Sequence, residues 1–212
     1  QEKAFLGIPD DHIMNIQNIS LPVKGLHGSI EKKPNELKLV YVARIHPTKN
    51  TLKAIEWLGG LSGNVQYDIY GSIENEMYWK QCQDAIARLP QNITVRYKGV
   101  IDHDQVASTI AGYHAYYMPT TGENFGHSIV EAMLKGKPVV ISDQTPWTDV
   151  NGNGGFAISL NDEKAFITAL DELVKMNIDK YSVLSGQLET YTKRKLNLDD
   201  IIHHYIMPFD GE

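Results

Sequence analysis

Short apolar segments alternate with amphipathic segments along most of this 212-residue chain. The apolar segments have the length of buried strands, and the segments between them carry apolar residues at helical spacing. The expected strands are residues 38–44, 65–71, 93–99, 115–119, 138–142 and 155–160, and the expected helices are 49–61, 74–88, 102–111, 161–176 and one through 132–134. Such alternation requires right-handed β-α-β crossovers and a mainly parallel sheet covered on both faces. We therefore expect an α/β protein with a three-layer α/β/α domain.

Two regions lie outside this alternation. Residues 1–37 include a turn-rich stretch and are typical of a linker or lead-in segment rather than of a domain. Residues 178–212 carry apolar side chains at helical spacing, first from Tyr181 to Tyr191 and then from Ile201 to Ile206. We expect these C-terminal helices to pack on the core or on a missing domain. Residues 38–177 are then the domain itself.

The composition is that of an ordinary soluble globular protein, with 42% hydrophobic and 22% charged residues. A net charge of −6 argues against a broad nucleic-acid-binding surface, which needs an excess of Lys and Arg. The sequence contains no apolar run long enough to span a membrane, and its first residues lack the apolar region of a signal peptide. The single cysteine, Cys82, excludes an internal disulfide and a thiolate zinc cage. A cytoplasmic location is therefore the expectation.

The most distinctive loop is the segment 123–131, Glu-Asn-Phe-Gly-His-Ser-Ile-Val-Glu, between an apolar strand and a helix. Ligands of parallel α/β sheets bind beyond the carboxyl ends of the strands, where this loop lies. The first N–H groups of a helix have no partners within it, so they form a natural anion site. Carboxylates beside that site can accept hydrogen bonds from sugar hydroxyls. Together these groups indicate a nucleotide-sugar ligand.

A second polar cluster, residues 44–50, follows the first expected strand. Arg44 ends the strand and Lys49 begins the expected helix, so two cations lie near one strand end. Such a pair suits the two phosphates of a diphosphate, or the charge that develops on a leaving phosphate. The alternative is a surface arginine and a lysine without a ligand. Because a cation at a helix N-terminus is electrostatically unfavourable, Lys49 needs a reason to be there.

Two glycines, Gly71 and Gly99, each close an expected strand at the same edge. Either glycine can simply permit a turn, and together they permit close backbone approach by a ligand. The chain contains neither Gly-x-Gly-x-x-Gly nor a Gly-Lys-Ser/Thr P-loop. A dinucleotide-dependent dehydrogenase and an NTPase are therefore disfavoured.

These features in combination resemble a known enzyme family. The pattern consists of Arg44 and Lys49 spaced by five, Gly71 after the second strand, and Glu123 and Glu131 spaced by eight. It is similar to the donor-binding domain of retaining GT-B glycosyltransferases, most closely glycosyltransferase family four. The resemblance covers roughly residues 38–175. It implies a single Rossmann-like domain with a mainly parallel sheet, the C-terminal half of a GT-B fold.

The resemblance also implies roles for individual residues. Arg44, Lys49 and Glu123 would be catalytic, the cations holding the departing diphosphate and the carboxylate lying by the transferred sugar. Donor binding would fall to Gly71, Val100, Asn124, Phe125, Gly126, His127, Ser128 and Glu131. Among these, Glu131 would accept hydrogen bonds from the ribose, and the backbone around Val100 would read the base.

The resemblance further implies that the backbone amides of the loop contact the sugar and the diphosphate of the donor. Those of residues 124–126 would approach the sugar, and those of 127 and 128 the diphosphate. The resemblance implies no metal and no other cofactor, because the two cations replace a metal electrostatically. The triplet 102–104, Asp-His-Asp, is similar to the metal-binding triplet of another glycosyltransferase fold, but its position predicts a helix cap. The family often has an aliphatic residue in place of His127. Trp147 is expected either to cover the site or to be a buried anchor.

The expected activity is retaining transfer of a hexosyl group from an NDP-sugar to a glycan or lipid-linked acceptor, in surface polysaccharide biosynthesis. In GT-B enzymes an N-terminal domain binds the acceptor, so this chain resembles one half of such an enzyme and an excised domain is favoured. The full-length enzyme would act at the inner face of the membrane, with peripheral association as one possibility. The alternatives are a standalone nucleotide-sugar-binding module, a GT-B epimerase and a phosphorylase.

Overall fold

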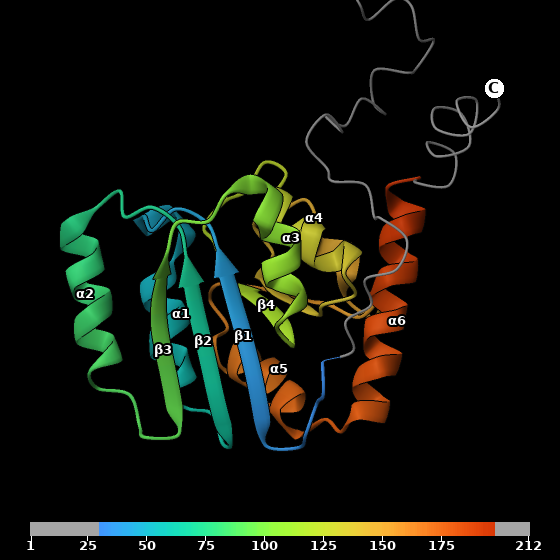
Figure 1. Cartoon of the computed structure of the whole chain (residues 1–212), viewed down its shortest axis with the longest axis horizontal. Coiled ribbons are helices and arrows are strands. Elements are labelled where there is room, and N and C mark those ends of the chain that lie inside the picture. The colour runs from blue at the N-terminus through green and yellow to red at the C-terminus, as the bar shows by residue number, and fades with distance from the viewer. Residues whose placement is uncertain (1–29, 198–212) are drawn as a thin grey trace, which may run out of the picture.

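The computed structural model describes residues 30–197 (Figure 1). Most of the lead-in segment 1–37 and the helix expected through 201–206 therefore lie outside the described residues. Within the described part, six strands form one parallel sheet in the order β3-β2-β1-β4-β5-β6. This is a Rossmann-like arrangement, and it confirms the predicted fold class.

The elements follow the predicted order closely. The strands are β1 (Glu36–Val42), β2 (Asn64–Tyr70), β3 (Ile93–Gly99), β4 (Ala115–Met118), β5 (Val139–Ser142) and β6 (Phe156–Ile158). The α-helices are α1 (Thr51–Leu58), α2 (Glu76–Ile86), α3 (His103–Ala111), α4 (His127–Leu134), α5 (Glu163–Lys175) and α6 (Ile178–Lys195). Two short 3-10 helices, η3 (Pro47–Lys49) and η4 (Thr148–Val150), follow β1 and β5. The first strand lies two residues earlier than the expected span 38–44, so it begins inside the predicted lead-in segment.

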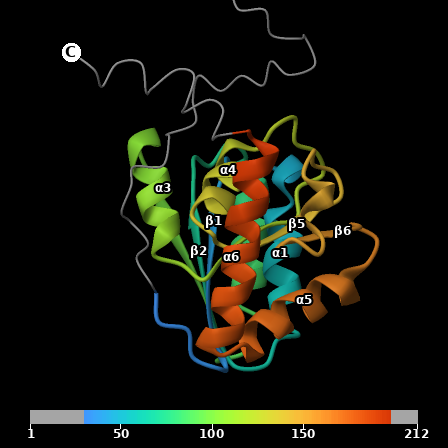
Figure 2. The ribbon, with the colours of Figure 1, turned by 90° about the vertical axis from the view of Figure 1, so that its right-hand side faces the viewer.

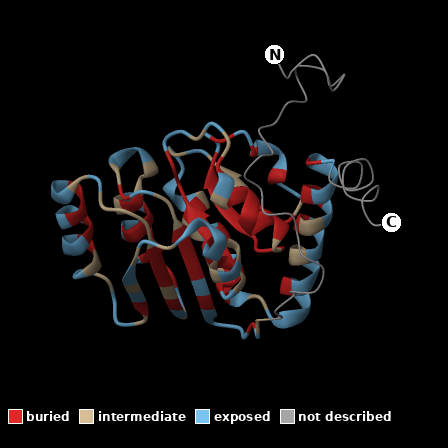
Figure 3. Cartoon of the chain, turned by 45° about the horizontal axis from the view of Figure 1, so that its top comes forward, coloured by how far each residue is buried: buried red, intermediate tan, exposed pale blue. Residues whose placement is uncertain are grey.

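The helices form a layer on each face of the sheet (Figure 2). On one face α1 contacts both α2 and α5, and on the other α4 contacts both α3 and α6. Strands β4 and β5 are buried at every position, because helices cover both of their faces (Figure 3). Trp57 of α1 stacks on Phe166 of α5 with ring centroids 4.7 Å apart, which joins two helices of one layer.

The last described helix, α6, packs on the core rather than standing free. Its Leu188 is fully buried, and the Tyr181 hydroxyl donates a 2.7 Å hydrogen bond to the His114 carbonyl oxygen. The Tyr191 hydroxyl donates a 2.6 Å hydrogen bond to the Asp149 carboxylate. Within residues 30–197, no helix is both long enough and apolar enough to cross a membrane.

Candidate donor-binding site

A cavity of about 300 Å³ opens at the carboxyl end of the sheet. Its wall consists of Val42, Ala43, Arg44, Lys49, His103, Val106, Glu123, Gly126, His127, Ser128 and Glu131. They belong to the end of β1 and the segment after it, to α3, and to the end of the β4–α4 loop and the first half of α4. Because the strand order reverses between β1 and β4, the cavity lies at the switch point where ligands of such sheets bind.

Lys49 reaches the cavity from a 3-10 turn and not from the start of α1. The His46 side chain caps this turn by accepting a hydrogen bond from the Thr48 amide, and Lys49 is its last residue. Asn50 follows in the left-handed region at φ 58°, and α1 begins only after it. The expected helix 49–61 was therefore too long at its N-terminal end. The predicted electrostatic penalty on Lys49 does not arise, since the lysine ends one helical segment instead of beginning another.

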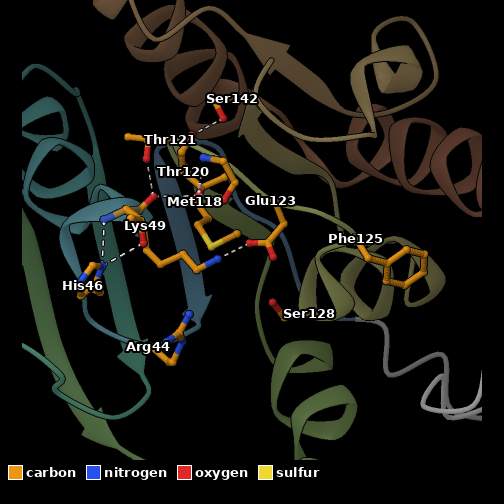
Figure 4. Close-up of polar contacts among 12 residues, drawn as sticks. Arg44, His46, Lys49, Met118, Thr120, Thr121, Glu123, Phe125, Ser128 and Ser142 are labelled. Atoms are coloured by element: carbon orange, nitrogen blue, oxygen red, sulfur yellow. Dashed lines mark hydrogen bonds and ion pairs between the residues drawn. The ribbon is translucent and has the colours of Figure 1, made fainter. Parts of the chain in front are cut away.

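Both expected cations are paired with carboxylates. The Lys49 ammonium forms an ion pair with Glu123, and the two side chains are only 12% and 19% exposed. Arg44 forms a 2.9 Å ion pair with Glu74, but its side chain is 61% exposed. In Figure 4 the Lys49 side chain points at Glu123, and Arg44 lies below Lys49 in this view. Lys49 is thus the more enclosed cation, and Glu123 compensates its charge.

The loop that carries Glu123 is fixed by hydrogen bonds to two neighbouring loops (Figure 4). The Thr48 carbonyl oxygen accepts from the Thr121 amide at 2.8 Å and from both threonine hydroxyls, of residues 120 and 121, at 3.0 Å. The Glu123 amide donates to the Gln144 carbonyl oxygen at 3.0 Å. The carboxylate is therefore attached to a loop whose backbone is held on both sides.

Helix α4 directs its N-terminus into the cavity. Gly126 occupies the N-cap position at φ 76°, where a Cβ atom would lie 2.8 Å from the Ile129 Cδ1 atom. The Ser128 hydroxyl is 2.8 Å from the Tyr116 hydroxyl, which donates to the Val42 carbonyl oxygen at 3.2 Å. These contacts tie the start of α4 to β4 and to the end of β1. Because α4 begins at His127, Glu131 lies about one turn into it.

Glu131 is the most unusual group in the wall. It is 4% exposed, and neither carboxylate oxygen has a hydrogen-bond partner among the described residues. Desolvation raises the pKa of this carboxyl, while the nearby His103 and Lys135 partly oppose the rise. The His103 Nδ1 atom is 4.0 Å from Glu131 Oε1. A buried carboxylate with unused acceptors is prepared for a ligand that donates hydrogen bonds.

Several predicted site residues are not part of the cavity wall. Asn124 is exposed, and the Phe125 ring packs against His127 and Trp147 with its side chain directed away from the Lys49–Glu123 pair (Figure 4). Trp147 is only 2% exposed and donates through Nε1 to the Phe125 carbonyl oxygen, so it is a buried anchor. Binding through the backbone amides of residues 124 and 125 stays a prediction.

Gly71 and Val100 also lie outside the wall. A Cβ atom at Gly71 would be 1.9 Å from the Ala43 carbonyl oxygen, so the close backbone approach at this glycine is made by the chain itself. Val100 is 68% exposed at the end of β3. Contact of either residue with a donor stays a prediction, and Gly71 already has a structural reason to be glycine.

His103 and Val106 line the cavity but were not among the predicted site residues. Both belong to α3, and His103 was interpreted only as part of a helix cap. Asp102 does occupy the N-cap position, but its side chain makes no capping hydrogen bond. The one signal available was the position of this triplet just after a strand end, which places it at the ligand edge. Across residues 30–197, no group of three or more His, Cys, Asp or Glu side chains is arranged to hold a metal ion.

The fold and the cavity define a class of protein. Over 84% of its length, the chain superposes on 49% of HepE from Anabaena, solved with UDP and glucose, with a TM-score of 0.68 and 19% sequence identity. It covers 98% of the catalytic domain of cholesterol-α-glucosyltransferase from Helicobacter pylori, matching 75% of its own length at a TM-score of 0.62 and 14% identity. The chain thus has the fold of a GT-B glycosyltransferase C-terminal domain.

The sequence comparison gives the family. Residues 24–189 match the family described as glycosyl transferases group 1, and the chain belongs to it. A curated relative, the O-antigen chain mannosyltransferase B of Escherichia coli, is 27% identical over 133 residues, or 59% of this chain. The matched region spans 34% of that relative, so the chain corresponds to only part of its length.

Proposed function

We propose that this chain is the donor-binding domain of a retaining glycosyltransferase that transfers a hexosyl group from an NDP-sugar. The observation that carries the proposal is the combination, around one cavity, of a helix N-terminus, two cations and a buried carboxylate without a partner among the described residues. Each group matches one part of the donor. The family membership of the chain supports the same conclusion.

In this proposal the diphosphate binds between the α4 N-terminus and the two cations, Arg44 and Lys49. The amides of His127 and Ser128 are free N–H groups of the first helical turn, and they favour an anion. An ammonium group has three N–H donors, so Lys49 can contact Glu123 and a phosphate oxygen together. Arg44 uses Nη1 for Glu74, and the other N–H groups of a guanidinium suit a second phosphate.

The two glutamates bind the remaining parts of the donor, which are the ribose and the transferred sugar. Glu131 accepts hydrogen bonds from the ribose hydroxyls, which satisfies acceptors that are otherwise buried and unused. Glu123 lies by the transferred sugar, where the ion pair with Lys49 fixes its orientation. When the glycosidic bond to the diphosphate breaks, Lys49 and Arg44 stabilise the negative charge on the leaving group. This role requires no resident metal.

Similar proteins support the nucleotide part of this proposal. HepE has been solved with UDP and with UDP-glucose, and TarM from S. aureus with UDP. The Escherichia coli relative is a mannosyltransferase for O-antigen chains, which supports a role in surface polysaccharide biosynthesis. The acceptor, a glycan or lipid-linked sugar, binds through another domain of the complete enzyme. The enzyme then acts in the cytoplasm, at the inner face of the membrane.

Truncation of Lys49 tests the diphosphate position. We expect Lys49→Ala to weaken binding of UDP and GDP by roughly tenfold or more, because it removes a poorly exposed cation that donates a charge-assisted hydrogen bond. Arg44→Ala should have a smaller effect, since its side chain is more exposed and better screened. Isothermal titration calorimetry measures both affinities, and a thermal melt checks that each variant is folded.

Lys53 provides a matched control for Lys49. It lies on α1, is 53% exposed, and pairs with Glu56 away from the cavity wall. Lys53→Ala should leave nucleotide affinity unchanged. If UDP and GDP bind equally well to wild type, Lys49→Ala and Arg44→Ala, the proposed diphosphate site is wrong.

A further inference from the structure

His103 forms a part of the cavity wall to which the proposed function gives no role. It begins α3 and faces the cavity beside Glu131. Its side chain is 60% exposed, so a ligand that enters the cavity can reach the ring.

The His103 and Glu131 side chains lie close together without a direct hydrogen bond. The Nδ1 and Oε1 atoms are 4.0 Å apart, which is too long for a direct hydrogen bond. Helix α3 packs on α4, and its Val106 and Ile110 side chains are buried in the core. Glu131 belongs to the buried face of α4. Both residues therefore have backbone positions that are fixed by helix packing.

The chemistry of the two groups selects one kind of occupant for this gap. Two hydrogen bonds of about 2.8 Å each can span 4.0 Å through a single shared atom. That atom must donate to the carboxylate and accept from the imidazole N–H. A hydroxyl group does both, whereas a phosphate oxygen only accepts and an ammonium only donates.

We propose that His103 and Glu131 bind one ribose hydroxyl of the donor nucleotide between them, with His103 Nδ1–H as the hydrogen-bond donor. This inference rests on the proposed function, since it takes the ligand to be a nucleotide. It adds a ribose-binding residue from α3 to the one on α4. The donor nucleotide is then held across two helices, and the hydroxyl satisfies a carboxylate oxygen that has no partner within the described residues.

The test compares nucleotides that lack one hydroxyl with variants that lack one protein group. Calorimetry would measure UDP or GDP, whichever wild type binds more tightly, together with its 2′-deoxy and 3′-deoxy forms. The variants are His103→Ala, His103→Asn and, as a control, Asp104→Ala on the same turn of α3. Asparagine places an N–H donor close to the position of Nδ1, so it should restore binding if donation is the role of His103.

We expect His103→Ala to bind the parent nucleotide roughly fivefold more weakly, the size of one lost hydrogen bond. For one of the two deoxy forms, His103→Ala and wild type should bind with the same affinity, because the bridged hydroxyl is already absent. His103→Asn should recover most of the affinity, and Asp104→Ala should match wild type. A structural role for His103 would instead weaken all three nucleotides equally.

Two failures can be told apart. If wild type binds no nucleotide, the proposed function and this inference both fall. The other case is that wild type binds nucleotide and Glu131→Gln weakens this binding. If His103→Ala then has wild-type affinity, or loses the same affinity for all three nucleotides, only the role of His103 is overturned.

Discussion

Replacing Glu131 with glutamine is expected to stabilise the ligand-free domain while weakening its binding of nucleotide. The wild-type carboxylate is 4% exposed and has no hydrogen-bond partner among the described residues, so its charge is poorly solvated. Glutamine keeps the shape and removes the charge. We expect the free energy of unfolding to rise by about 1 kcal/mol, a fraction of the usual cost of an unsatisfied buried charged group. Thermal or urea denaturation of the two proteins measures this difference.

Glu131→Gln should also lower the affinity for UDP and GDP roughly 10- to 100-fold. A hydrogen bond to a charged acceptor contributes more to binding than one to a neutral acceptor. Glu172→Gln, on the exposed surface of α5, is the control and should change neither stability nor affinity. Lower stability together with unchanged nucleotide affinity in Glu131→Gln would show that the carboxylate is structural.

The raised pKa of Glu131 gives this prediction a pH dependence. Between the ordinary value of 4.5 and the higher pKa in the folded protein, the folded state binds more protons than the unfolded state. Stability from this group therefore increases as the pH falls through that window and decreases as the pH rises. Glu131→Gln should remove this contribution, so the stability gain of the variant should be largest at neutral pH and should shrink toward pH 4.5.

Gly71→Ala is expected to be strongly destabilising, by about 3 kcal/mol or more, because it adds overpacking to backbone strain. Gly71 has φ 143°, a conformation that residues with a Cβ rarely adopt. The new Cβ would lie 1.9 Å from the Ala43 carbonyl oxygen, which is backbone and cannot rotate away. The chain segments after β1 and β2 would have to separate beside Arg44. A urea unfolding curve measures the loss of stability.

Gly186→Ala is the matched control for this substitution. Gly186 lies in the exposed part of α6, and outside its own helical turn no described atom comes within 4 Å of the place that an alanine methyl group would take. Alanine there should stabilise the protein by roughly 0.5–1 kcal/mol through its better helix propensity. A Gly71→Ala protein as stable as wild type would mean that the segments after β1 and β2 are far less constrained than the structure indicates.

Much of the fold could be predicted because the central strands are continuous apolar runs. Helices cover both faces of β4 and β5, so every position of these strands is apolar or small, and their limits are visible in the sequence. The break between η3 and α1 was missed because the apolar spacing of the helix begins only at Leu52 and does not show where the helix starts. Asn50 in the left-handed region gives that break, and its only local signal is Pro47 three residues earlier.

The site was predictable where its residues share one loop and not where it depends on tertiary contacts. Glu123 and Glu131 could be grouped from spacing alone. The ion pair of Glu123 with Lys49 joins residues 74 positions apart, which no local pattern reveals. The contribution of His103 depends on how α3 packs on α4, and the need for glycine at position 71 depends on the Ala43 carbonyl oxygen of another strand end.

The most direct test of donor binding in this cavity is a nuclear magnetic resonance titration of the backbone amides with UDP and GDP. We predict that one of the two nucleotides shifts the amide signals of Gly126, His127 and Ser128 most strongly, and that Glu131→Gln needs a higher nucleotide concentration for the same shifts. No shift at saturating nucleotide, or largest shifts among residues remote from the cavity wall, would contradict a donor site at the start of α4.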